Sequence, residues 1–98
     1  MRNNNRQNIP NHLRKLRKQR GLKQNEVAQI LGLKSTSMIS RWEAGLCLPE
    51  TQNLFRLAII YRTSSEGLYH IFTRRLQAKL AEKEEQIFKN RIHGEHQC

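Results

Sequence analysis

Hydrogen-bonding side chains are concentrated between Gln24 and Arg41, in a stretch that also shows helical spacing. Thr36, Ser37 and Arg41 stand at positions 0, 1 and 5 of one short segment, on the outward side of the helix predicted there. Hydroxyls and a forked guanidinium are side chains that hydrogen-bond to base edges in a major groove. Gln24 stands at the predicted start of the preceding helix, where an amide and free backbone N–H groups can bind a phosphate. These residues therefore predict recognition of a nucleic acid.

Two short helices joined by a tight turn must position these side chains. The first is predicted over residues 24–31 and ends at Gly32. The second follows the hydroxyls of residues 35–37, which can cap its first N–H groups, and ends at Gly45. The apolar side chains expected to face inward are Val27, Ala28, Leu31, Ile39 and Trp42.

Three further helices are predicted around this pair, over residues 10–19, 50–61 and 64–91. The last is expected to begin at a capping box formed by Thr63 and Glu66. Its start should be anchored in the core by Leu68, Ile71 and Phe72, while Leu76, Leu80 and Ile87 continue a thinner apolar pattern interrupted by Lys83. The predicted fold is all-α, a bundle of four to five helices with an extended C-terminal helix. It divides into a flexible basic arm (1–9), a helical domain (10–73) and a C-terminal extension (74–98).

Composition restricts the classes of function. The 98 residues leave room for one domain, and 18 lysines and arginines against 8 acidic residues give a formal net charge of +10. Such an excess indicates a polyanionic partner, but charge alone does not distinguish DNA, RNA and an anionic membrane. The longest apolar runs, such as residues 57–60, are too short to span a membrane, and the first residues lack an apolar signal core. The sequence therefore predicts a cytoplasmic protein without a membrane partner.

Residues typical of enzymes or metal sites are not arranged in a recognisable motif. His12 and His70 fall within predicted helices without a nucleophile placed beside them, and glycine-rich phosphate loops and paired acids are missing. His93, His96 and Cys98 are potential metal ligands, but three ligands at a chain end predict no site. Cys47 and Cys98 lack redox spacing and are expected to be thiols. We expect no enzymatic activity, no metal and no cofactor.

Three segments within residues 11–72 resemble a known family. They are LRKLRKQRGLKQNEVAQILGL, SMISRWEAG and LPETQNLFRLAIIY. Their residues and spacing are similar to those of the Cro and lambda-repressor-like helix-turn-helix family, also called Xre-type transcriptional regulators. The resemblance implies a lambda-repressor-like bundle that binds double-stranded DNA as a homodimer and acts as a repressor.

The resemblance also implies roles for individual residues. Thr36, Ser37 and Arg41 would face bases, and Gln24 would bind a backbone phosphate and also lie within reach of a base. Arg17 would form a structural ion pair with Glu43. The other residues expected at the DNA surface are Lys34, Ser35 and Ser40, the two serines lying near phosphates.

The chain departs from the family pattern at two places. Six residues separate Gly32 from Ile39, one more than is usual, so the base-contacting positions are either those named or their neighbours displaced by one. Lys23 stands where a capping serine or threonine is common, which weakens the cap of the helix at residues 24–31 by about 1 kcal/mol. It also offers a further phosphate contact.

Two other functions are compatible with the sequence. An antitoxin-like or adaptor protein would use residues 74–91 to bind a protein partner, because the DNA-binding core does not require that helix. Binding of RNA, or of any nucleic acid through charge alone, would show similar salt dependence without sequence preference.

Overall fold

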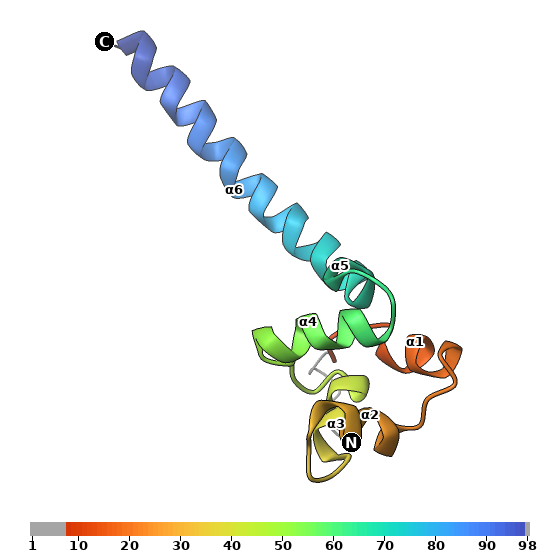
Figure 1. Ribbon diagram of the computed structural model, residues 1–98. Coiled ribbons are helices and arrows are strands. Elements are labelled where there is room, and N and C mark those ends of the chain that lie inside the picture. The colour runs from red at the N-terminus through yellow and green to blue at the C-terminus, as the bar shows by residue number, and fades with distance from the viewer. Residues whose placement is uncertain (1–7, 98) are drawn as a thin grey trace, which may run out of the picture.

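The computed structural model describes the backbone of residues 8–97 and the side chains of residues 8–92 (Figure 1). Its helices, in chain order, are α1 (Leu13–Gln19), α2 (Gln24–Leu31), α3 (Ser37–Ala44), α4 (Thr51–Ile60), α5 (Ser65–Leu68) and α6 (His70–Gln97). The first five form one bundle, and α6 projects away from it as a single long rod (Figure 1). This arrangement confirms the predicted all-helical bundle with an extended C-terminal helix.

The hydrophobic core lies where α1 to α5 meet. Trp42 is only 2% exposed, which confirms that its indole is a core residue and is not displayed to solvent. The predicted inward residues of α2 and α3 are all buried. The core consists of Leu13, Val27, Ala28, Leu31, Ile39, Trp42, Leu57, Ala58, Tyr61, Leu68 and Tyr69.

Both helices of the predicted helix-turn-helix end at a glycine, as expected. Gly32 and Gly45 have φ angles of 77° and 78°, a left-handed conformation that L side chains rarely adopt. This conformation turns the chain so that Leu33 N–H donates to the carbonyl of Ala28 at 2.8 Å, closing the end of α2. The predicted bounds of α2, residues 24–31, are confirmed.

Helix α1 begins at Leu13, so the predicted start at Pro10 is wrong. The preceding residues form contacts with distant parts of the chain that a helix would not allow. Ile9 N–H donates to the carbonyl of Gly45 at 2.8 Å, and His12 N–H donates to that of Leu68 at 2.9 Å. Ile9, which the sequence assigns to the flexible arm, packs against the core. Residues 1–7 of that arm lie outside the part of the chain that the structure describes.

The predicted helix over residues 64–91 is divided in two. Tyr69, with φ −130° and ψ 45°, interrupts it between α5 and α6. Leu68 and Tyr69 are both buried at the break, and the Leu68 carbonyl accepts the His12 N–H at 2.9 Å, so this point of the chain is held by a distant segment. The cap is also displaced by one residue, because Ser64 Oγ, not Thr63, accepts the Gly67 N–H at 3.0 Å. Ile71 is 45% exposed and does not anchor the helix as expected.

The ends of α4 and α6 also differ from the prediction. Glu50 and Tyr61 cap α4 instead of belonging to it, because both have non-helical backbone angles. Helix α6 continues past Gly94 to Gln97. A glycine within a helix costs about 1 kcal/mol, which is too little by itself to end one.

The two tyrosines of the chain, Tyr61 and Tyr69, should make stability fall at alkaline pH. Burial raises the pKa of each phenol from 10.0 to about 12, and the Glu43 carboxylate adds to the rise at Tyr61. Because the folded-state pKa lies above the unfolded value, the neutral phenols stabilise the fold fully below pH 10, and this contribution is lost between pH 10 and about 12. Urea unfolding at stepped pH, with tyrosinate absorbance recorded in parallel, measures the loss.

The matched control for this titration is Tyr61→Phe, which keeps the buried ring and removes the titrating hydroxyl. We expect the decline of the unfolding free energy between pH 10 and 12 to be shallower in this variant than in the parent protein. Equal declines in the two proteins would contradict the assignment, because the lysines titrate in both.

Candidate nucleic-acid interface

Helix α3 has one face in the core and one in solvent. Ile39 and Trp42 are buried against the other helices. Ser37, Ser40 and Arg41 are exposed on the other side. Because the inward stripe holds the helix in place, the outward hydroxyls and guanidinium are presented on a rigid support.

The turn before α3 carries the remaining residues predicted to meet DNA. Lys34 and Ser35 are exposed, and Thr36, at the N-cap position, is half-buried. The Ser35 hydroxyl accepts the Ser37 N–H at 3.3 Å and donates to Ser37 Oγ at 3.1 Å. Of the three hydroxyls that can cap α3, Ser35 therefore supplies the contact to the backbone, and Thr36 forms no side-chain cap bond.

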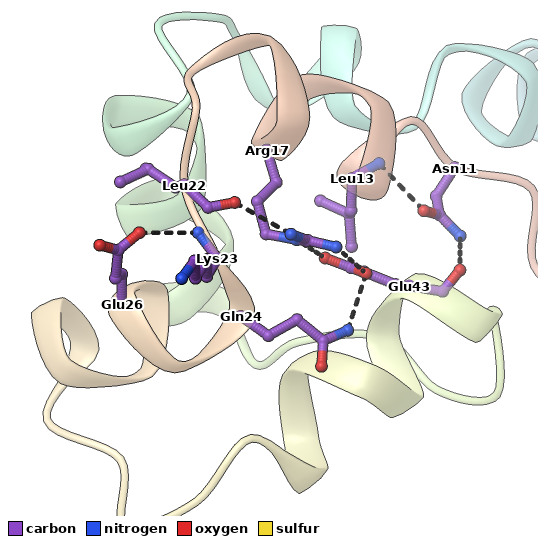
Figure 2. Close-up of polar contacts among 8 residues, drawn as sticks. All are labelled: Asn11, Leu13, Arg17, Leu22, Lys23, Gln24, Glu26 and Glu43. Carbon is purple, nitrogen blue, oxygen red and sulfur yellow. Dashed lines mark hydrogen bonds and ion pairs between the residues drawn. The ribbon is translucent and has the colours of Figure 1, made fainter.

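A buried ion pair joins α1 to α3 (Figure 2). Arg17 Nε donates to Glu43 Oε2 at 2.6 Å and Arg17 Nη2 donates to Glu43 Oε1 at 3.1 Å, the pair that the family resemblance implies. The two side chains are only 9% and 6% exposed. The hydrogen bonds with Glu43 raise the pKa of Arg17 above its usual value, against the opposing effect of burial.

Two further contacts complete this network. Arg17 Nη1 donates to the carbonyl of Leu22 at 2.9 Å, which fixes the turn between α1 and α2. Gln24 Nε2 donates to Glu43 Oε1 at 3.0 Å, so the first residue of α2 is also held (Figure 2). The sequence prediction did not include this contact. One N–H of the Gln24 amide remains free of this contact, and that N–H is the group able to donate to a phosphate.

The start of α2 compensates in part for its lysine cap. A lysine side chain cannot accept a hydrogen bond, but the Glu26 carboxylate accepts the Lys23 backbone N–H at 2.8 Å. The acidic half of a capping box is therefore present. The Lys23 side chain is exposed beside it, in keeping with the predicted additional contact to a phosphate.

A shallow cavity of about 360 Å³ lies where α1, α2 and α3 meet. It brings together Gln24 and Ser40, two residues predicted to meet phosphates, above the Arg17–Glu43 pair. Arg14 lines the same cavity and is exposed. Arg14 is not among the site residues predicted from the sequence, although its position three residues before Arg17 places both on one side of α1.

Metal ligands, cysteine thiols and membrane-spanning helices are three other features that would indicate a function among the described residues. The side chains there include no group of three potential metal ligands, and His93, His96 and Cys98 lie outside the side chains described. Cys47 is a free, half-buried thiol. Among the helices described, none combines the length and the apolar character needed to cross a membrane.

Comparison with known proteins agrees with this geometry. A family profile described as helix-turn-helix matches residues 13–68, which is more than half of the chain and covers α1 to α5. The comparisons with curated proteins and with solved structures gave no match. The matched region contains the α2–α3 pair, the Arg17–Glu43 bridge and the exposed face of α3. The chain belongs to the Cro/lambda-repressor-like helix-turn-helix family of DNA-binding regulators.

Proposed function

We propose that this protein is a sequence-specific transcriptional repressor whose helix α3 enters the major groove of double-stranded DNA. The observation that carries the proposal is the exposed row of Ser37, Ser40 and Arg41 opposite a fully buried apolar stripe. A major groove accommodates an α-helix, and each base pair presents a distinct set of donors and acceptors there. A rigid helix with short polar side chains suits that surface.

The proposed contacts divide into two groups. Thr36, Ser37 and Arg41 meet base edges and discriminate sequence. The remaining residues contact phosphates and set the position of α3 in the groove; they are Gln24, Lys34, Ser35 and Ser40. Gln24 is well suited to this role because its amide is already oriented by Glu43, so little side-chain freedom is lost on binding.

The proposed assembly is a homodimer on a two-fold symmetric operator. Two copies of α3 would enter successive major grooves on one side of the duplex, about 34 Å apart. Repression then follows from occupation of the operator, without catalysis or a cofactor, in the cytoplasm where the DNA is accessible.

Selection of bound sites from random duplexes tests the proposal. We expect an enriched motif with two related half-sites, and binding that unrelated duplex DNA competes for only weakly at fixed salt. Recovery of no motif, with affinity set by salt alone, would instead show binding through charge.

Replacing Arg41 by alanine should relax the preference at one base pair. The loss of a bidentate guanidinium contact is expected to cost about 1–3 kcal/mol of discrimination at that position. Competition between duplexes that differ at single positions measures it. Lys34→Ala is the matched control, because losing a phosphate contact should weaken binding to all sequences alike and lower the salt slope by about 1.

A second candidate function is supported by α6. Leu80 and Ile87 on this helix are 61% and 56% exposed, which the DNA-binding bundle does not require. An antitoxin-like or adaptor role would place a different protein on that helix. Co-purification of a defined partner that shields α6 from proteolysis would favour this function.

A further inference from the structure

Helix α6 has a long exposed segment. All residues from Arg74 to Ile92 are exposed. The 28 residues of α6 extend about 42 Å at 1.5 Å per residue, well beyond the bundle. Isolated helices are only marginally stable in water, and most helices in proteins are stabilised by packing of an apolar face. An apolar face that is left open on such a helix is therefore expected to bind a partner.

Three exposed apolar residues of α6 fall at the a and d positions of one heptad frame, while Phe88 and Ile92 lie outside it. With Thr73 at position a, Leu76 occupies d, Leu80 occupies a and Ile87 occupies the next a. Leu76, Leu80 and Ile87 are 43%, 61% and 56% exposed. The stripe continues into the base of the bundle, where Phe72 and Leu76 line two grooves of about 620 and 160 Å³ on either side of the helix.

Charged residues beside the stripe indicate which partner fits it. Lys79 falls at position g and Glu84 at position e, five residues later. In a parallel, in-register pair of helices, position g of one chain lies next to position e of the following heptad in the other. Lys79 of each copy would then meet Glu84 of the other, twice per dimer. An antiparallel pair brings g toward g and e toward e, and Lys79 then has no acidic partner, because the other g positions with described side chains are Phe72 and Gln86.

We propose that α6 forms a parallel two-stranded coiled coil with α6 of a second copy of this chain. Leu76, Leu80 and Ile87 form the seam, and Lys79 and Glu84 form two reciprocal ion pairs. Lys83 occupies a d position of the seam, where a polar side chain lowers the stability of the pair and restricts its register. The parallel direction puts both bundles at the same end of the coil, so that both copies of α3 can face one duplex. This inference rests on the homodimer of the proposed function and names the surface that forms it.

Charge reversal tests the pairing in the full-length chain without DNA. Lys79→Glu and Glu84→Lys each replace two attractive contacts by two repulsive ones, and each should weaken the dimer about tenfold in sedimentation equilibrium. The double variant Lys79→Glu/Glu84→Lys restores opposite charges and should return to within about threefold of the parent dissociation constant. An equimolar mixture of the two single variants should form a heterodimer more tightly than either forms a homodimer.

Two outward positions of the same helix provide matched controls. Glu85 and Lys89 fall at f and c, so Glu85→Lys and Lys89→Glu make the same charge changes away from the seam. These variants should leave the dimer unchanged, and far-UV circular dichroism of the dimers should show equal helix content.

Several results would overturn the proposal. They are a chain that stays monomeric at all concentrations, single variants that behave like the controls, and a double variant that is not rescued. A different result would contradict the proposed function and not the coiled coil. A dimer that selects no DNA motif contradicts operator binding alone. Selection of a single half-site by a monomer contradicts the homodimer and its coiled coil, and leaves sequence-specific DNA binding intact.

Discussion

Replacing Arg17 by methionine is expected to lower the free energy of unfolding by about 3–5 kcal/mol. The substitution leaves the Glu43 carboxylate, whose side chain is only 6% exposed, without its cationic partner. It also removes the hydrogen bond to the carbonyl of Leu22, which joins α1 to the turn before α2. Urea unfolding at neutral pH, followed by far-UV circular dichroism, measures the difference.

Two further variants identify the cause of that loss. Lys18→Met removes an exposed charge from the next position of α1 and should change stability by no more than about 0.5 kcal/mol. Arg17→Met/Glu43→Leu removes both buried charges and should be more stable than Arg17→Met alone. If Arg17→Met cost no more than Lys18→Met, the ion pair would not hold α1 to α3.

Replacing Gly45 by alanine is expected to destabilise the bundle by about 3 kcal/mol. A side chain in its left-handed conformation costs about 1–2 kcal/mol, and crowding of a packed site adds a similar amount. A Cβ at this position would lie 2.5 Å from the carbonyl oxygen of Ile9 and 2.8 Å from its nitrogen, both of which are backbone atoms. The segment before α1 would have to move away, although Ile9 N–H is bonded to the Gly45 carbonyl.

Gly32→Ala is the matched control for this prediction. Gly32 has nearly the same φ, 77° against 78°, but a Cβ there would have no atom within 4 Å. Only the backbone cost of about 1–2 kcal/mol should remain. The hydrogen-exchange rate of the Ile9 amide gives a local measurement. This rate should rise in Gly45→Ala and stay unchanged in Gly32→Ala. Equal losses of stability in the two variants would refute the role of the close approach.

The fold depends on local patterns at some positions and on distant contacts at others. The bounds of α2 were predictable because Val27, Ala28 and Leu31 form its buried stripe and Gly32 permits the left-handed turn that ends it. The start of α1 was not predictable, because it depends on Asn11. Its side chain accepts the Leu13 N–H and donates to the carbonyl of Glu43, 32 residues away. The contact with Leu13 is local, but no pattern near Pro10 indicates the contact with Glu43.

The candidate site shows the same division. The outward position of Ser37 and Arg41 follows from the spacing of two apolar residues on one helix, which the sequence alone shows. The contact between Gln24 and Glu43, and the cavity that Arg14 shares with them, appear only in three dimensions. These residues come from three helices, whose crossing angles decide which side chains meet.

The amino-acid sequence by itself determined the helical class, the helix pair and the face of α3 that meets solvent, because hydrophobic periodicity and glycine conformation act over a few residues. Tertiary structure alone decided where α1 begins, and it divided α5 from α6 at Tyr69. At this break the Leu68 carbonyl must accept the N–H of His12, which lies far earlier in the chain. That requirement comes from the shape of the whole bundle, which no local pattern encodes.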